Sequence, residues 1–165
     1  LEAILGAALT LARKRVRIVT PYFLPDARLQ FAIAQAALRG VAVQIVLPHK
    51  SDQRVMDWAM AAHVRFFRHV GAHFFATQGH FDHSKLATVD GEWCLIGSSN
   101  WDARSFRLNF EFDLECYGAD FTAAIDAAID QRIARGRALT PEALLARPVW
   151  LRLRDAAARL ILPYL

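Results

Sequence analysis

The sequence has 165 residues, of which 55% are hydrophobic and 22% are charged. This length corresponds to one domain, and the apolar content is sufficient for a substantial core, which excludes a disordered tail. A formal net charge of +4 at pH 7 favours anionic partners: lipid headgroups, a membrane surface or nucleic acid.

Helical and extended patterns alternate along the first half of the chain. They predict helices over 1–14, 26–39 and 53–69, and strands over 16–20, 41–47 and 72–76. A hairpin and a long strand are predicted next, and helices are predicted near 119–135, 141–146 and 148–162. This order indicates an α/β fold, in which helices cover both faces of a mixed β-sheet.

The hairpin is centred on Asp90-Gly91, a strong two-residue turn signal. With this turn as the loop, His83 is expected opposite Ser98, and Lys85 opposite Ile96. Because side chains alternate along a strand, His83, Lys85 and Ser98 are expected on one face. Asn100 joins them if the strand continues. These groups together suit the binding and transfer of a phosphoryl group.

Two carboxylates are assigned different tasks. Asp90 is expected about 16 Å from Lys85, since an extended strand rises roughly 3.3 Å per residue, so a structural or supporting role is predicted. Glu111 lies on the strand predicted over 109–117. It is the candidate for orienting His83, because a carboxylate on one imidazole nitrogen leaves the other free to attack.

Further candidates lie at the carboxyl ends of the first two predicted strands, where open α/β sheets bind ligands. Tyr22 and Lys50 are therefore predicted to line the pocket. No metal site is predicted, because the remaining histidines form no tight ligand pair with a carboxylate.

The last predicted helix is amphipathic. One side of its helical wheel is apolar and the other is charged. The apolar side carries Trp150, Leu153, Ala157, Leu160, Ile161 and Tyr164, and the charged side carries Arg152, Asp155 and Arg159. This pattern fits a helix lying on an anionic bilayer and equally a last helix packed on the domain.

The motif around the hairpin resembles the HKD signature of the phospholipase D superfamily. The matching spacing is His83-x-Lys85-x4-Asp90-x6-Gly97-Ser98-x-Asn100. Flanking segments resemble, more narrowly, the second half of bacterial cardiolipin synthases. These segments are TPYFLPD at 20–26, LPHKSD at 47–52, RSFRLNFE at 104–111 and the ending from Arg147.

The resemblance implies a two-step displacement at a phosphodiester, without a metal or another cofactor. A neutral His83 attacks phosphorus and forms a phosphohistidine, while Lys85, Asn100 and Ser98 hold the nonbridging oxygens. A second histidine protonates the leaving alkoxide and later activates the acceptor alcohol.

The source of that second histidine is left open, because the chain contains one HKD motif. Superfamily members have two, from duplicated halves of one chain or from two identical chains. Leu1 is not an initiator methionine, and the chain starts inside a helical pattern without an N-cap residue. Residues 1–165 are therefore interpreted as a single phospholipase D-like domain, the second of two halves, in preference to a homodimeric subunit.

The leading functional hypothesis is a phosphatidyltransferase of cardiolipin synthase type, with phosphatidylglycerol as substrate and an anionic membrane surface as partner. It would lie peripherally on the bacterial inner membrane, at the cytoplasmic face. The alternatives are a phosphodiesterase, either a phospholipase or a homodimeric nuclease, and a noncatalytic membrane-binding module. Nucleic acid is disfavoured, because a single-strand binder should show aromatic residues interleaved with Lys and Arg, and lysine is scarce in this sequence.

Overall fold

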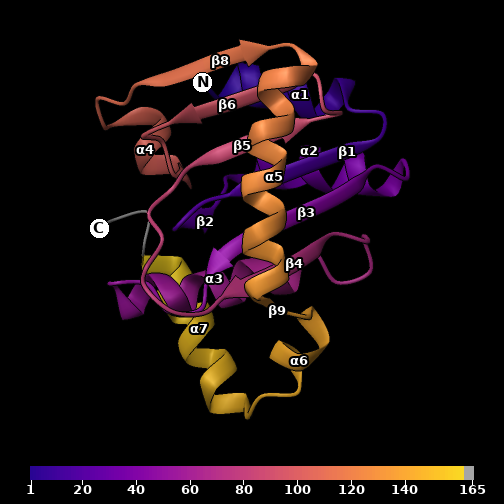
Figure 1. Ribbon diagram of the computed structural model, residues 1–165. Coiled ribbons are helices and arrows are strands. Elements are labelled where there is room, and N and C mark those ends of the chain that lie inside the picture. Colours follow the sequence, from indigo (N-terminus) through magenta and orange to yellow (C-terminus); the bar gives the residue numbers. More distant parts are fainter. Residues whose placement is uncertain (162–165) are drawn as a thin grey trace.

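The computed structural model describes residues 1–161, which fold around a seven-stranded mixed sheet. Its strand order is β8-β6-β5-β1-β3-β4-β9. Helices α1, α2 and α3 cover one face and α5 crosses the other, whereas α7 packs against α3 at the β9 end of the sheet (Figure 1). The predicted α/β class, with helices on both faces of a mixed sheet, is confirmed.

The elements follow one another along the chain with short connections. They are α1 (Glu2–Leu11), β1 (Arg15–Val19), β2 (Phe23–Leu24), α2 (Ala27–Leu38), β3 (Ala42–Pro48), α3 (Arg54–Phe66), β4 (His73–Thr77), β5 (Leu86–Val89), β6 (Trp93–Gly97), β7 (Trp101–Asp102), α4 (Ala103–Arg107), β8 (Asp113–Tyr117), α5 (Ala119–Arg135), β9 (Gly136–Ala138), α6 (Pro141–Leu145) and α7 (Val149–Ile161). The elements that the sequence pattern did not predict, β2, β7, β9 and α4, have only two to five residues each.

Strand directions bring several chain ends to one edge of the sheet. β1, β3 and β4 run parallel, whereas β5 is antiparallel to β1, β6 to β5 and β8 to β6. The carboxyl ends of β1 and β3 therefore lie at the same edge as the start of β5, the end of β6 and the start of β8. A separate pair of parallel strands, β2 and β7, lies after β1 and β6 in the chain.

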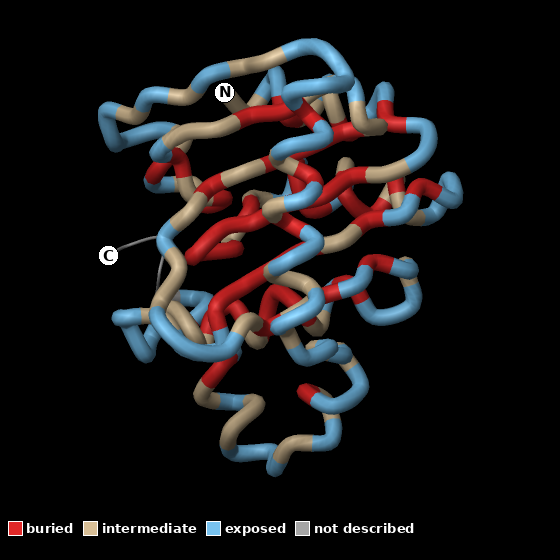
Figure 2. The backbone as a smooth tube through the Cα atoms, in the orientation of Figure 1, coloured by how far each residue is buried: buried red, intermediate tan, exposed pale blue. Residues whose placement is uncertain are grey.

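Apolar side chains cover both faces of the central strands. Ile18, Ile33 and Ile45 belong to the larger buried cluster, and Ile129 of α5 packs with Val19 and Val46 in a second one. Figure 2 shows burial concentrated in the central strands, while most of the outer loops are exposed. This rigid centre holds the loops of the edge described above.

The predicted register of the hairpin is wrong by one residue. Leu86 pairs with Ile96 and Val89 with Trp93, so the loop has three residues, 90–92. The backbone N–H of Glu92 donates to the Val89 carbonyl oxygen at 3.1 Å, which removes Glu92 from the ladder. The expected pairings of His83 with Ser98 and of Lys85 with Ile96 do not form, because β5 begins at Leu86 and β6 ends at Gly97.

The strand predicted over 109–117 is also shorter than expected and starts at Asp113. Ser98 ends the ladder: its backbone N–H donates to the Phe112 carbonyl oxygen at 3.0 Å, and its hydroxyl accepts from the Phe112 N–H at 2.9 Å. Glu111 therefore lies in a loop, between two exposed phenylalanines, Phe110 and Phe112.

Two observations concern membranes. No helix within residues 1–161 is long and apolar enough to cross a bilayer. The amphipathic helix predicted over 148–162 is observed as α7. Tyr164, predicted on its apolar side, lies outside the described residues.

Candidate active site

Loops from separate parts of the chain form a polar cluster at the sheet edge. Residues 80–85 precede β5, residues 98–100 follow β6, and residues 108–112 precede β8. The antiparallel register places Leu86 beside Val19 and Asp113 beside Gly97, so these loops meet at the carboxyl end of β1. Most of the predicted site residues are thereby brought to one edge.

His83 and Lys85 are in direct contact. Lys85 Nζ lies 2.8 Å from His83 Nδ1 and donates to the His83 carbonyl oxygen at 2.7 Å. Lys85 is only 8% exposed, whereas the imidazole is open to solvent. The ring of Tyr22 lies edge-on to that of His83, with centroids 6.1 Å apart. The centroid of the Phe81 ring lies 5.5 Å from that of the imidazole. Two aromatic rings thus limit the orientation of the imidazole.

Burial lowers the pKa of both groups. The pKa of His83 is lowered by burial and by the charge of Lys85, which outweigh the carboxylates of Asp52 and Asp82. Burial also lowers the pKa of Lys85, although Glu111 and other carboxylates oppose this shift. A histidine with a lowered pKa is neutral at pH 7, which is the form that can attack an electrophile.

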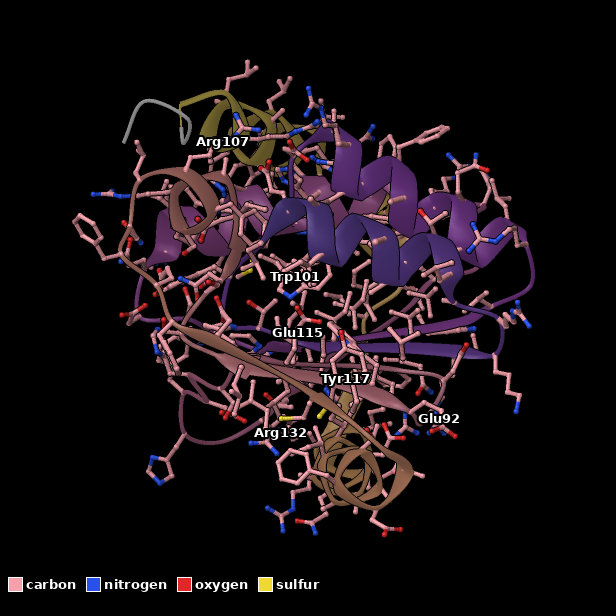
Figure 3. All side chains as sticks on the ribbon, turned by 90° about the horizontal axis from the view of Figure 1, so that it is seen from above. Glu92, Trp101, Arg107, Glu115, Tyr117 and Arg132 are labelled. Atoms are coloured by element: carbon pink, nitrogen blue, oxygen red, sulfur yellow. The ribbon has the colours of Figure 1, made fainter. Side chains whose placement is uncertain are left out.

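The loop that carries His83 is tied to α5 by a charged clamp that the sequence did not reveal. Asp82 accepts hydrogen bonds from the backbone N–H of Ser84 at 2.9 Å and from Arg132 Nε at 2.7 Å. Arg132 Nη2 also donates to the Ser84 hydroxyl at 3.1 Å, and Figure 3 shows Arg132 on the α5 side of the sheet. Hydrogen bonds from Ser84 and Arg132 lower the pKa of Asp82, although burial raises it. The hydrogen bond from the Ser84 N–H to Asp82 spans two residues, a local pattern that aspartate often forms in turns. This part of the contact could therefore be expected from the sequence.

Gly97 lets the loop of residues 98–100 approach the loop of residues 108–112. A Cβ at this position would overlap the Asp113 carboxylate and lie 2.6 Å from the Phe112 carbonyl oxygen. Ser98, the next residue, donates its hydroxyl hydrogen to Glu111 Oε2 at 2.5 Å. The glycine of the motif is thus needed for the close contact between the loops that hold Ser98 and Glu111.

Glu111 does not make the predicted contact with His83. Its oxygens accept from Ser98 and from Asn109 Nδ2 at 3.1 Å, and no hydrogen bond joins it to the imidazole within the described residues. These hydrogen bonds lower its pKa against the effect of burial. Glu111 lies near enough to Lys85 for its charge to raise the pKa of that ammonium.

Asn100 has an unusual hydrogen-bonding environment. Its Nδ2 donates to the Ser105 hydroxyl at 3.3 Å, while its Oδ1 is buried and has no partner among residues 1–161. A buried polar atom without a partner is costly. Rotation of the amide by 180° would present the NH2 group in its place, as a donor for an anionic ligand.

Tyr22 and Lys50 occupy different positions. Tyr22 is buried, and its hydroxyl donates to Asp52; burial and this carboxylate raise its pKa. Lys50 is exposed and lines a cavity of about 770 Å³ between the end of β3, α3 and α7. Asp52 links this cavity to the cluster, because it lies in the same loop as Lys50 and binds Tyr22.

Asp90 is not part of the cluster. It lies at the opposite end of β5, where it accepts from the backbone N–H groups of Arg13, Lys14 and Arg15, each at 2.8 Å. Its carboxylate therefore joins the hairpin turn to the start of β1.

Metal-ligand geometry is not found in the described part of the chain, where no group of three or more histidine, cysteine or carboxylate side chains could hold an ion. His63 is buried in α3 with Nδ1 3.0 Å from the Ala59 carbonyl oxygen, and burial lowers its pKa to about 4.

The chemistry available at the cluster is that of a neutral imidazole, a buried ammonium, hydroxyls and an amide. Such groups can attack and stabilise a phosphoryl centre.

Comparison with known proteins agrees with this chemistry. A family model described as cardiolipin synthase, PLD-like domain, matches residues 5–133. The chain is 36% identical to the cardiolipin synthase of Listeria monocytogenes and 39% identical to cardiolipin synthase A of Escherichia coli, each over 154 residues. These alignments cover 93% of this chain and 32% of each relative, so the chain spans about a third of their length.

Solved structures share the fold at low identity. The phospholipase D family member Nuc from Salmonella typhimurium has a TM-score of 0.75 at 20% identity, covering 84% of this chain and 90% of that one. The phosphatidylserine synthase of Haemophilus influenzae has a TM-score of 0.75 at 17% identity, covering 97% of this chain and 44% of that one.

Proposed function

The chain belongs to the cardiolipin synthase PLD-like domain family, and we propose that it provides half of the active site of a phosphatidyltransferase. The reaction moves a phosphatidyl group from one phospholipid to the hydroxyl of another, with phosphatidylglycerol as the substrate. The contact between His83 and the buried ammonium of Lys85 is the observation that carries the proposal, because it keeps a nucleophilic imidazole neutral beside a cation.

In the first step, His83 attacks the phosphorus of the donor lipid. A P–N bond forms and the P–O bond to the leaving alcohol breaks, while a second histidine supplies the proton to the departing alkoxide. In the second step, that histidine takes the proton from the acceptor hydroxyl, which displaces His83 from phosphorus. The phosphodiester is thus exchanged without hydrolysis.

Lys85 and Asn100 are proposed to hold the nonbridging oxygens. A buried ammonium stabilises developing negative charge more strongly than an exposed one, because solvent screens it less. Ser98 is assigned to the same task, although its hydroxyl must first turn away from Glu111, to which it donates. We assign Asp90 to the structure of the hairpin, outside the reacting groups.

The second histidine is proposed to come from another half-site, in the same polypeptide or in a second copy of the chain. Residues 1–165 then form one phospholipase D-like domain of a two-part site. An exposed apolar strip beside the cluster supports such a partner. It runs along the loop before β8 and onto the start of this edge strand, and consists of Leu108, Phe110, Phe112 and Leu114.

Localisation on the bacterial inner membrane, peripherally and at the cytoplasmic face, completes the proposal. The net charge of +4 supports attraction to a surface that carries anionic lipid.

A phosphodiesterase that uses water in place of an acceptor alcohol is the second candidate. The likeness in fold to Nuc, a phospholipase D family member, favours it. Transferase and hydrolase share the phosphohistidine step, and the products distinguish them: cardiolipin and glycerol from phosphatidylglycerol in one case, phosphatidic acid in the other.

A short-chain phosphatidyl ester of p-nitrophenol tests the shared step. Nitrophenolate leaves without a proton, so His83 can react even when the second histidine is absent. We expect a burst of one nitrophenolate per chain, and a base-stable, acid-labile phosphohistidine by mass spectrometry. The matched pair is His83→Ala, which should show no burst, and His80→Ala, at an exposed histidine three residues earlier, which should show a full one. An equal burst in both variants would refute the assignment.

A further inference from the structure

Helix α7 packs with its apolar side outward. Val149, Trp150, Leu153 and Leu160 are between 65 and 73% exposed, and they recur at the spacing of a single helix face. The side chain of Asp155, in the middle of the same helix, is completely buried. This arrangement is the reverse of an ordinary surface helix, whose apolar stripe faces the core.

Polar contacts determine which side of α7 faces the domain. Asp155 accepts from Arg147 Nη1 at 3.0 Å and from Arg154 Nη2 at 2.8 Å. The guanidinium of Arg154 lies over the ring of Trp58 on α3, 4.3 Å from its centre. Arg65, also on α3, donates to the Arg152 carbonyl oxygen at 3.4 Å. Turning the apolar stripe inward would break these contacts, so the outward stripe is fixed by the packing.

We propose that the stripe formed by Val149, Trp150, Leu153 and Leu160 docks on an anionic lipid surface, with α7 lying in the plane of the interface. This inference rests on the proposed function, since a lipid substrate brings the domain to such a surface. Large apolar side chains on one face and arginines around it are what an interfacial helix requires.

Charge on α7 favours an anionic surface as the occupant. Its sequence contains one acid, Asp155, and this carboxylate is buried and paired. Its arginines outnumber that acid, and Arg159 is exposed. The helix therefore presents only positive charge to its surroundings, which attracts anionic headgroups and repels a second copy of the same face.

The stripe is also separate from the surface proposed for the partner half. Strand β8 forms one edge of the sheet, whereas α7 packs on α3 beyond the opposite end (Figure 1). A partner covering β8 would leave α7 free.

Binding of the full chain to vesicles tests the proposal. The variant Leu153→Glu/Leu160→Glu is compared with Leu11→Glu/Leu38→Glu, which changes two leucines of similar exposure, 73 and 61%, on α1 and α2. Vesicles contain phosphatidylglycerol mixed with phosphatidylcholine, or phosphatidylcholine alone. Bound protein is measured by sedimentation, and the depth of Trp150 by quenching with lipids brominated on their acyl chains.

We expect the α7 variant to bind the anionic vesicles at least roughly tenfold more weakly than the parent, and the control variant to bind equally well. Bromolipid quenching should disappear in the α7 variant and in Trp150→Phe. Unchanged binding of the α7 variant, or an equal loss in the control, would overturn the proposal. So would conversion of a dimer to a monomer by the α7 variant, since a second protein then covers the stripe.

Two further measurements separate this inference from the proposed function. Circular dichroism should show both double variants folded, because the substituted leucines are exposed. The nitrophenolate burst with the soluble short-chain ester should persist in the α7 variant, because α7 carries none of the reacting groups. A parent chain that binds vesicles but gives no burst would refute the proposed chemistry and leave the docking surface standing.

Discussion

Replacing Asp90 by asparagine should lower stability and leave the chemistry of the folded protein intact. The carboxylate accepts three backbone N–H groups at the start of β1, each at 2.8 Å. Its backbone is left-handed, with φ of 56°, a conformation that asparagine tolerates well. The substitution therefore removes charge and one acceptor oxygen without adding backbone strain.

The expected cost follows from those three bonds. In asparagine, Oδ1 can keep the bonds from the N–H groups of Lys14 and Arg15, but these bonds become neutral. The N–H of Arg13 then faces the NH2 group of the amide and loses its oxygen acceptor. A hydrogen bond to a charged group contributes about 1.5–3 kcal/mol and a neutral one about 1 kcal/mol. Because this turn is partly exposed, water satisfies some of the loss, and a total near 2 kcal/mol is expected. For a chain of this size that lowers Tm by roughly 4–8 °C.

Urea unfolding at several pH values measures this difference. The backbone N–H groups of Arg15, Arg13 and Lys14 lower the pKa of Asp90, although burial opposes them. A carboxyl with a lowered folded pKa contributes stability above its unfolded pKa, about 3.9, and loses it as pH falls through the folded pKa. The difference in the free energy of unfolding between parent and variant should therefore be largest at pH 7 and decrease below about pH 4.

Glu92→Gln is the matched control, because Glu92 is exposed in the same turn (Figure 3) and the change removes the same charge. It should alter stability by less than about 0.5 kcal/mol. A variant Asp90→Asn that unfolds like the parent but gives no nitrophenolate burst would refute the division of roles, and would place Asp90 among the groups that act on the substrate.

Three further predictions concern the cluster itself. Gly97→Ala should destabilise the fold by about 1–3 kcal/mol in urea unfolding, because its Cβ would overlap the Asp113 carboxylate; wild-type stability would show that the loops have room. Arg132→Gln removes the ion pair with Asp82 and should slow the nitrophenolate burst about tenfold while changing stability by less than about 1 kcal/mol. A burst slowed only in proportion to unfolding would leave Arg132 a purely structural role. The burst rate should fall with acid at a midpoint below 6.5, the ordinary pKa of histidine, because burial and a neighbouring cation lower the pKa of His83; a midpoint at or above 6.5 would contradict that environment.

Much of the fold was predictable, because periodic patterns and short connections determine the order of long helices and strands. The register of the hairpin was not. Asp90-Gly91 supplies two left-handed residues, with φ of 56° and 77°, which suit a two-residue turn and equally a three-residue loop. The choice between these two turns depends on a contact of Glu92 with a distant part of the same chain. Its carbonyl oxygen accepts from the Gly118 N–H, just after β8, at 2.8 Å. That contact spans 26 residues and leaves no local signal.

The same limit applies to the site and to α7. The motif predicted that His83 and Lys85 lie together, as they do, but the ion pair of Asp82 with Arg132 joins residues fifty positions apart and has no local signal. For α7, the helical wheel separated the apolar and charged sides correctly. It could not tell which side faces inward, because the partners of Asp155 and Arg154 include residues outside the helix, Arg147 and Trp58.

Carboxylates surround a site that is proposed to bind a negatively charged phosphodiester, and their pairing explains how this is possible. Three of them each accept a hydrogen bond from a serine hydroxyl, which spreads the charge of the carboxylate and holds a loop in place. The pairs are Asp82 with Ser84, Glu111 with Ser98, and Asp113 with Ser99. Because these hydroxyl hydrogens are already donated, the stabilisation of phosphate falls mainly on Lys85 and the amide of Asn100. Lys85 is suited to that task, because it is a buried cation beside the proposed nucleophile, His83, and water screens its charge little.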